Sequence, residues 1–295
     1  MNTQPLATDF ANLLAARRLF VGKGAQQEAD YGRQRVARWI ANVSAAQSAK
    51  IEVNGAVRCF IPQTRSSAAP IFYLHGGGLV YYSTEVFSSF LSLLASLTGR
   101  EIRAFDYPKA PETPMVDIVG HLEQQLAREL GRVDAPPCLM GDSVGGLLAL
   151  WFAGSFNQAF SRLCLLYPVL ANHHDFDSFQ RYGEGYLLDA AIMRWFADHW
   201  LPWCRQQQFN PLAPDYAFDR LPEVVLHTAG YDVLADEGLA FAAHARQAGR
   251  ALQHHHHPAL PHDFCLYVGK LASSRQAVEH IARTLDAAHT FIGKQ

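Results

Sequence analysis

Short β-rich runs alternate with helical patterns along most of this chain, and the alternation limits the possible folds more than any other feature of the sequence. The runs predicted as strands are 71–74, 102–105, 138–140, 163–166, 224–227 and 252–256. The clearest helical patterns between them cover 85–97, followed by Gly99, and 236–248, followed by Gly249. Because a strand pairs in parallel with the next only through a crossover, the alternation predicts an α/β fold: a mostly parallel twisted sheet with helices on both faces.

Residues 1–50 precede this alternation and are predicted to form helices. Thr8 or Asp9 can cap a first helix. Apolar residues then recur at helical spacing, namely Phe10, Leu13, Leu14, Val36, Trp39, Ile40 and Val43. The pattern changes to β runs at Ile51, where Asn54-Gly55 is the signature of a two-residue type I′ hairpin turn. Residues 1–50 are therefore predicted to be an N-terminal helical cap, with the sheet beginning after them.

One interval, residues 171–209, interrupts the alternation because it contains no strand pattern. Aromatic residues crowd it instead: Phe176, Phe179, Tyr182, Tyr186, Trp195, Phe196, Trp200 and Trp203. Ile192 and Trp195 fall on one helical face, and Asp189 is suited to cap that helix. We interpret the interval as an inserted lid. Each aromatic residue alone can equally be core between helices, whereas the cluster as a whole can wall a pocket.

The segment Gly141-Asp142-Ser143-Val144-Gly145-Gly146 lies between an apolar strand and a helical run. This is the G-x-S-x-G pattern in the strand–turn–helix context that it requires. A serine hydroxyl is a poor nucleophile unless it is exposed and a base can take its proton, and the flanking glycines leave room for a strained turn that exposes Ser143. The same turn directs the N–H of Val144 to the place where a substrate carbonyl would become an oxyanion.

A glycine-rich loop, His75-Gly76-Gly77-Gly78, directly follows the predicted strand 71–74. Consecutive glycines lose backbone entropy and pack nothing, so they suit a place where the main chain approaches a ligand and donates N–H groups. A flexible loop is the alternative interpretation. Because the loop precedes the serine turn, where an oxyanion loop is expected, Gly77 and Gly78 are predicted to donate to an oxyanion together with Val144.

Two further residues are predicted to complete a catalytic triad with Ser143. In this type of fold the order along the chain is Ser, then Asp or Glu, then His. Asp232 follows the strand 224–227, and His262 follows the last strand, so both fall at the carboxyl edge of the sheet with Ser143. Asp236 is an alternative carboxylate, but with Glu237 it fits the acidic first turn of a helix better.

The remaining histidines and the cysteines predict no metal site and no cofactor. His254–His257 lie in a predicted strand and alternate between its faces, so they do not gather three ligands on one metal and are interpreted as structural. His227 and the pair His173-His174 are interpreted as packing or surface residues, and His75 as a support for the glycine loop. The five cysteines are scattered and odd in number, which favours reduced, buried thiols over a disulfide framework.

Several motifs together resemble the bacterial hormone-sensitive-lipase-like branch of the α/β-hydrolase esterases. They are HGGG at 75–78, GDSVGG at 141–146, YDVLADEG at 231–238, Asp-Tyr at 106–107 followed by Ala-Pro-Glu at 110–112, and His262-x-Phe264. The resemblance covers roughly residues 50–290. It implies a carboxylesterase acting on short to medium acyl chains, with Ser143 as nucleophile, His262 as base and Asp232 orienting that base.

The same resemblance implies a domain organisation. N-terminal cap helices would occupy 1–50, the first part of the catalytic α/β-hydrolase domain 51–170, a cap or lid insertion 171–209, and the second part of the catalytic domain 210–295. The residues proposed to line the substrate pocket are Leu79, Tyr82, Asp142, Phe179 and Trp195.

Four departures from the family pattern affect the expected substrate range. Val144 stands where alanine is usual, and Tyr81-Tyr82 stand where a glycine is frequent, so the pocket is expected to be narrower. Pro108-Lys109 replace a pair that is usually arginine and an apolar residue. Asp263 replaces a glycine beside the base; its carboxylate either turns inward, where it would raise the pKa of His262, or faces water. None of these departures removes a catalytic atom.

Composition and charge limit the partners. Lys and Arg number 25 against 27 Asp and Glu, so no overall field favours nucleic acid, and a small, fairly neutral ligand fits better. The resemblance implies that this ligand is a small-molecule ester substrate. Apolar stretches are shorter than the roughly 20 residues that cross a bilayer, and no secretory pattern opens the chain, which predicts a cytoplasmic location without a transmembrane segment. A homodimer is possible.

Two other activities stay open from the residues alone. An amidase, formamidase or aminopeptidase-like hydrolase would use the same triad but would have to protonate a poorer leaving group. A non-catalytic small-molecule-binding protein on the same fold would be expected to lack the nucleophile or the base, whereas all three members of the predicted triad are present here.

Overall fold

The computed structural model describes residues 4–18, 29, 32–34, 48–170, 175–250 and 252–286. Within this part, a single sheet of eight strands has the order β1-β2-β4-β3-β5-β6-β7-β8. The strands are β1 (Lys50–Asn54), β2 (Val57–Ile61), β3 (Ile71–Leu74), β4 (Ile102–Phe105), β5 (Cys138–Asp142), β6 (Arg162–Leu166), β7 (Glu223–Tyr231) and β8 (Leu252–Pro261). Strands β3 to β8 pair in parallel, and the hairpin β1–β2 adds an antiparallel edge.

All six predicted strands are present, but three of them extend further at their carboxyl ends. β5 continues to Asp142, which pairs with Leu166, and β7 and β8 continue until Tyr231 faces Pro261. The apolar pattern ended earlier because these last residues are polar, small or proline. Pairing with a neighbouring strand, rather than hydrophobicity, extends them, and the extension places each strand end directly before a predicted catalytic residue.

The hairpin turn falls one residue later than its sequence signature predicts. Asn54 pairs with Val57, so the two-residue turn consists of Gly55 and Ala56. Of these, Gly55 has a positive φ of 64°. A glycine at the first turn position accepts this conformation without strain, and it therefore decides the register instead of the Asn-Gly pair.

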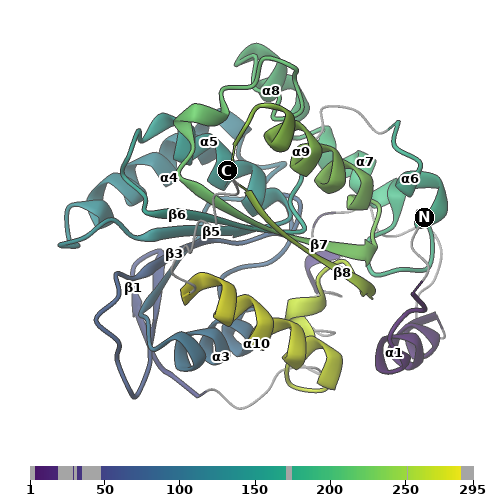
Figure 1. The fold of residues 1–295 in the computed structure, drawn as a ribbon, viewed down its shortest axis with the longest axis horizontal. Helices are drawn as coiled ribbons and strands as arrows, with labels where there is room; N and C mark the ends of the chain where they lie inside the picture. Colours follow the sequence, from purple (N-terminus) through teal and green to yellow (C-terminus); the bar gives the residue numbers. More distant parts are fainter. Residues whose placement is uncertain are drawn as a thin grey trace, which may run out of the picture.

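Helices cover both faces of the sheet, as the alternation predicted (Figure 1). One face carries α3 (Ser88–Thr98) and α10 (Ala272–Asp286); the other carries α4 (Met115–Leu130), α5 (Val144–Ser155) and α9 (Ala235–Gln247). The predicted helix 236–248 matches α9 to within one residue at each end, whereas α3 begins three residues later than predicted and ends at Gly99 in the left-handed conformation. Each face buries its own apolar cluster: Phe90 and Ile281 belong to one, and Leu122 and Phe241 to the other.

Within residues 1–50, the described residues 8–18, 29 and 32–34 are helical, whereas 4–7 and 48–50 are not, and Lys50 already belongs to β1. Helix α1 (Thr8–Arg18) begins at Thr8, and the Asp9 carboxylate accepts hydrogen bonds from the N–H and hydroxyl of Ser273 at 3.0 and 2.6 Å. Phe10 packs edge-on against Tyr267. The other apolar positions of the predicted cap, Val36 to Val43, lie outside the described residues, so the helical prediction for them stays a prediction.

Within the interval 171–209, the described residues form three short helices joined by turns and bends, and no strand. It holds α6 (Ser178–Arg181), α7 (Ala190–Ala197) and α8 (Leu201–Gln206), on the same side of the sheet as α9 (Figure 1). Asp189 occupies the N-cap position of α7, but its carboxylate accepts the N–H of Gly185 at 3.0 Å instead of a helix N–H. Two short 3₁₀ turns, Phe218–Arg220 and Phe264–Tyr267, complete the described elements.

Two whole-chain expectations can be compared with the described residues. All five cysteines are buried and unpaired, in agreement with reduced thiols. Among the helices of the described part, none is both long enough and apolar enough to cross a membrane.

Candidate active site

Ser143 occupies a strained turn between β5 and α5. Its φ of 52° and ψ of −123° are rare for a residue with a side chain. The turn is possible because Gly141 and Gly145 lie so close to their neighbours that a Cβ would meet the Gly145 oxygen and the Leu74 oxygen, respectively, at 2.1 Å. The turn places the Ser143 hydroxyl beyond the end of β5, in agreement with the geometry that the G-x-S-x-G pattern predicts.

The structure brings the three predicted triad residues into one hydrogen-bonded chain. Ser143, Asp232 and His262 each follow the last residue of a parallel strand, so all three lie at the carboxyl edge of the sheet. His262 Nε2 is 3.1 Å from Ser143 Oγ, and His262 Nδ1 is 2.7 Å from Asp232 Oδ2. Leu234 N–H donates to the other Asp232 oxygen at 2.9 Å. Asp236 binds Ser178 and Arg181 instead, which removes it as the alternative partner of the imidazole.

The imidazole is buried among negative charges. Burial alone lowers the pKa of His262, but the charges of Asp232 and Asp263, the hydrogen bond to Asp232 and the charge of Asp142 outweigh it and raise that pKa to about 9. Burial and the charge of Asp263 in turn raise the pKa of Asp142 to about 7. The site is therefore built to favour the positively charged form of its histidine.

The glycine loop has the left-handed backbone that glycine permits, with φ of 98° at Gly77 and 63° at Gly78. Two hydrogen bonds orient the peptide groups on either side of Gly76. Gly76 N–H donates to Asp142 Oδ1, and Gly76 O accepts from His75 Nδ1, both at 2.7 Å. Gly76 O and Gly77 N–H belong to one trans peptide unit and point in opposite directions. The hydrogen bond to His75 therefore also sets the direction of the Gly77 N–H.

His75 is held by two neighbours on the segment after β4. The Tyr107 ring stacks on the imidazole with 4.2 Å between centroids, and the Tyr107 hydroxyl donates to His75 O at 2.8 Å. Lys109 Nζ lies 2.9 Å from His75 Nε2. Since Nδ1–H must donate to a carbonyl, Nε2 is the acceptor and Lys109 the donor. Burial lowers the pKa of His75 well below its usual value and lowers that of Lys109 to about 7.

The interval 171–209 contacts the glycine loop directly. A Cβ on Gly78 would meet the ring of Phe196, from α7, at 2.2 Å. Phe196 packs edge-on against Tyr81 at 4.9 Å, and Trp195 lies 6.1 Å from the same ring. Aromatic residues of the predicted lid thus lie beside the backbone that is predicted to hold the oxyanion.

The five predicted pocket residues have different surroundings. Leu79 is fully buried in the apolar cluster and Phe179 nearly so. Asp142 is also fully buried, and its carboxylate accepts hydrogen bonds from Gly76 N–H and the Tyr73 hydroxyl. Tyr82 and Trp195 are partly exposed, and the Tyr82 hydroxyl donates to Asp263 Oδ2 at 2.9 Å. Contact of any of the five with substrate stays a prediction.

The sequence did not predict the residues that hold Asp142 and His75 in place. Tyr73 is a strand residue in an apolar run, and nothing in its pattern signals that it donates to Asp142 at 2.5 Å. Lys109 appeared only as a departure from the family pattern. A signal existed for Tyr107, because it belongs to the Asp-Tyr segment that carries the resemblance, but its stacking on His75 depends on the placement of β3 beside β4.

The histidines of β8 alternate between the two faces of the strand, as predicted. On one face, His257 Nε2 is 3.0 Å from His227 Nδ1, and His255 Nδ1 is 3.2 Å from His280 Nε2. On the other, His254 and His256 both lie 2.8 Å from the Thr228 hydroxyl. Within the described residues, no group of three or more histidine, cysteine or acidic side chains could hold a metal ion.

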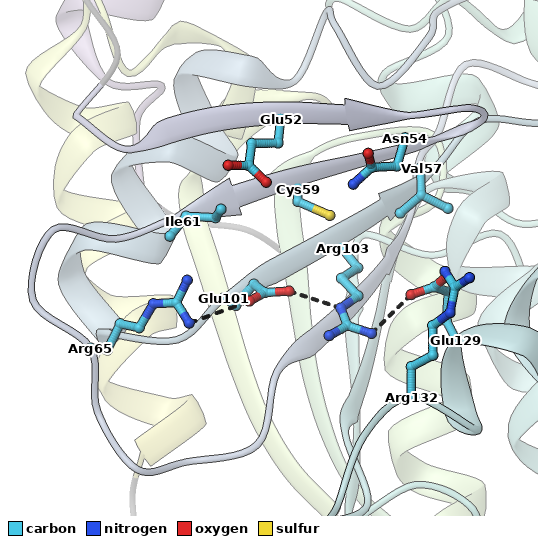
Figure 2. Close-up of a pocket in the computed structure, with 10 residues that line it drawn as sticks. All are labelled: Glu52, Asn54, Val57, Cys59, Ile61, Arg65, Glu101, Arg103, Glu129 and Arg132. Carbon is cyan, nitrogen blue, oxygen red and sulfur yellow. Dashed lines mark hydrogen bonds and ion pairs between the residues drawn. The ribbon is translucent and has the colours of Figure 1, made fainter.

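A polar cavity of about 330 Å³ lies away from this site, over β1, β2 and β4 (Figure 2). Its charged side chains pair with one another: Arg103 donates to Glu101 and to Glu129, each at 2.8 Å, and Arg132 contacts Glu129 at 2.6 Å. Because these ion pairs already neutralise Arg103 and Glu129, the two least exposed charges among them, we assign the cavity no role in the chemistry.

Comparison with known proteins identifies the family and the fold of this chain. The profile of a protein family described as "alpha/beta hydrolase fold" matches residues 71–266. An ethyl acetate hydrolase of Pseudomonas putida is 36% identical over 214 residues, 67% of this chain and 66% of that protein. An esterase of Gibberella moniliformis is 29% identical over 195 residues, 61% of each chain. The chain thus spans a little less than two-thirds of the length of these relatives.

Solved structures extend the likeness to nearly the whole chain. An esterase of Pyrobaculum calidifontis superposes with a TM-score of 0.83 at 21% identity, covering 95% of this chain and 98% of that one. A thermostable esterase of Pseudomonas putida gives 0.82 at 21% identity, covering 96% and 97%. With the sheet order and the turn at Ser143, these superpositions define the class as the α/β-hydrolase fold, as predicted. Because the family profile covers more than half of its length, the chain belongs to the α/β-hydrolase family.

Proposed function

We propose that this chain is a carboxylic ester hydrolase in which Ser143 is the nucleophile, His262 the general base and Asp232 the carboxylate that orients it. The observation that carries the proposal is the hydrogen-bonded chain from Asp232 through His262 to Ser143, all three at most 6% exposed. The names of the relatives, an ethyl acetate hydrolase and an esterase, support the same reaction class.

In acylation, His262 Nε2 takes the hydroxyl proton as Ser143 Oγ forms a bond to the ester carbonyl carbon, and the carbonyl electron pair moves to the oxygen. The N–H groups of Gly77, Gly78 and Val144 would receive this oxyanion. Within the described residues, these three N–H groups donate to no other acceptor. Asp232 holds the Nδ1–H and stabilises the imidazolium, which then gives its proton to the departing alkoxide.

In deacylation, His262 takes a proton from water while the water oxygen attacks the acyl carbon. The second tetrahedral intermediate collapses, the bond to Ser143 Oγ breaks, and the imidazolium returns the proton to that oxygen. No cofactor is required for either half-reaction. Short- to medium-chain acyl esters are the proposed substrates, supported by the ethyl acetate of the Pseudomonas putida relative and by the aromatic side chains beside Gly78.

Replacing the nucleophile tests the proposal. Ser143→Ala should lower kcat for p-nitrophenyl acetate and butyrate by at least about 10⁴-fold, because the residues of a triad act as a unit. The matched control is Ser155→Ala, since Ser155 is an exposed serine at the end of the same helix, α5. It should keep full activity. Equal ester hydrolysis by wild type and Ser143→Ala would remove the catalytic assignment, and cleavage of the matching anilides faster than the esters would favour an amidase.

A further inference from the structure

Asp263 turns its carboxylate toward the imidazole that precedes it in the chain. Its backbone is left-handed, with φ of 57°, a conformation that aspartate tolerates better than most residues. Asp263 Oδ1 lies 3.6 Å from His262 Nε2, and its side chain is 13% exposed. Of the two orientations that the sequence allows, the structure therefore has the inward one.

The Tyr82 hydroxyl fixes this orientation. It donates to Asp263 Oδ2 at 2.9 Å across a separation of 181 residues. Tyr82 itself lies just beyond the glycine loop with a left-handed backbone and packs edge-on against Phe87. Both residues depart from the family pattern, Tyr82 in the segment after the glycine loop and Asp263 beside the base, and they contact each other.

The groups around His262 come from the ends of three other strands and from the residues that follow His262 in the chain. Asp232, after β7, faces Nδ1, whereas Ser143 and Asp263 face Nε2. Asp142, at the end of β5, adds a more distant charge. Tyr167, after β6, contacts the ring edge-on, and Cys265 lies in the 3₁₀ turn Phe264–Tyr267, which begins two residues after His262. Burial raises the pKa of both Tyr167 and Cys265 well above their usual values, so these two are neutral.

We propose that Asp263, oriented by Tyr82, is a positioning residue that stabilises the protonated form of His262. It thereby raises the pH at which ester hydrolysis reaches its full rate, and it increases that rate. The proposal rests on the function proposed above. A carboxylate at each end of the ring, Asp232 at Nδ1 and Asp263 at Nε2, favours the imidazolium more than one carboxylate does.

This charge has opposite effects on two states of the enzyme. In the resting state, the imidazolium must lose its proton before Nε2 can accept the one from Ser143, so a higher pKa leaves less active enzyme at neutral pH. During the reaction, the imidazolium forms as Ser143 attacks, and Asp263 stabilises it along with the tetrahedral intermediate. The proton moves only between Ser143, His262 and the leaving alkoxide; Asp263 neither gains nor loses one.

The pH profile of Asp263→Asn separates these effects. Asparagine has the same shape, suits the left-handed backbone and still accepts from Tyr82, so only the charge is lost. The midpoint of the acid limb of kcat/KM for p-nitrophenyl butyrate should fall by about one pH unit. With a Brønsted coefficient near 0.5, the variant should be about threefold faster than wild type at pH 7 and about threefold slower at pH 10. The two profiles should therefore cross.

Three controls distinguish charge from structure. Tyr82→Phe should lower the midpoint of the acid limb of kcat/KM by a smaller amount than Asp263→Asn, because the Asp263 carboxylate keeps its charge but loses the hydrogen bond that orients it. Asp263→Gly, which restores the residue usual in the family, should match Asp263→Asn. Asp219→Asn, at an exposed carboxylate far along the chain, should leave the profile unchanged. Melting temperatures of all variants report whether folding is affected.

An NMR titration of the His262 imidazole in the Ser143→Ala background tests the same inference without catalysis. Adding Asp263→Asn should lower the midpoint of that titration. An unchanged midpoint, or rates that fall by the same factor at every pH, would overturn the inference while leaving the esterase proposal intact. Loss of the esterase proposal alone would appear as wild-type hydrolysis that does not depend on Ser143, with the titration midpoint still displaced.

Discussion

At the scale of single residues, the candidate site combines a strained backbone at Ser143 with several charged groups around one imidazole. Ser143 holds a conformation that costs on the order of 1–3 kcal/mol, and close glycine contacts on both sides maintain it. Three carboxylates, Asp142, Asp232 and Asp263, contribute to the pKa of one imidazole. Such concentrations of perturbed groups are typical of functional sites, because ordinary packing would avoid their cost.

Lys109 provides a residue-scale prediction. Its ammonium or amine group donates to His75 Nε2, which keeps the proton on Nδ1 and so holds the Gly76–Gly77 peptide. Lys109→Met should lower kcat for ester hydrolysis about tenfold with KM within about twofold, less than the 10²–10³-fold cost of a lost oxyanion donor because the donor is only misdirected. Steady-state kinetics would check this.

Lys109→Arg is the matched variant for that test, because it keeps a charged donor in place. It should recover most of the lost kcat. A Lys109→Met enzyme that loses affinity for substrate but keeps its kcat would contradict an action through the glycine loop.

At the scale of elements, β8 combines two roles. Its carboxyl end positions His262, while its middle is packed with imidazoles against β7 and α10. Burial, with the charges of the neighbouring histidines, lowers the pKa of His257 to about 3 and that of His227 well below 6.5. These rings are neutral in the folded protein, so they fit together only while they carry no charge.

The histidines of β8 predict a loss of stability in acid. The unfolded chain takes up protons below about pH 6.5, whereas folded His227 and His257 resist protonation, so their contribution is present above pH 6.5 and is lost as the pH falls. At pH 5, each of these two histidines should reduce the free energy of unfolding by about 2 kcal/mol relative to pH 7.5. Urea unfolding at the two pH values measures this.

His257→Gln should reduce the difference between the free energies of unfolding at pH 5 and at pH 7.5, since glutamine does not titrate. His121→Gln, in α4 on another part of the molecule, serves as the control and should leave the difference unchanged. If stability at pH 5 and at pH 7.5 proved equal in the wild type, the neutral packing of these rings would be refuted.

At the scale of the whole molecule, Arg33 of the N-terminal segment contacts two segments beside the candidate site that are distant from it in sequence. Arg33 donates to the carbonyl oxygens of Val80 and Ala110, both at 2.8 Å, and pairs with Glu112. Val80 follows the glycine loop, and Ala110 follows Lys109. The Arg33 guanidinium therefore connects the segment that follows His75 and the glycine loop with the segment that contacts His75, over sequence separations of 47 and 77 residues.

Arg33→Met should destabilise the protein by about 2 kcal/mol, because two carbonyl groups in a partly buried setting lose a charged donor. Glu112→Gln should cost less than about 1 kcal/mol, since the Glu112 side chain is 57% exposed and water screens its ion pair. Thermal or urea unfolding of the two variants compares them. An equal cost for both would assign the effect to the surface ion pair instead of the carbonyl contacts.

Much of the fold and of the candidate site could be predicted from local patterns. The six strand runs, the Ser143 turn and the positions of Asp232 and His262 all follow from residue type and order, because a strand, a turn and a helix each have a local signature. The strand ends could not be predicted: β8 continues to Pro261 because β7 offers it hydrogen bonds, and no property of Pro258 or Pro261 signals this.

Local patterns are thus enough to predict the α/β class, the turn at Ser143, the glycine loop and the order of the three residues that meet at the sheet edge. The tertiary structure alone decided that Asp263 faces His262, that Tyr82 holds it there, and that Lys109 and Tyr107 brace His75. Backbone conformation follows from neighbours in sequence, but the orientation of a charged side chain depends on which distant groups the folded chain places around it.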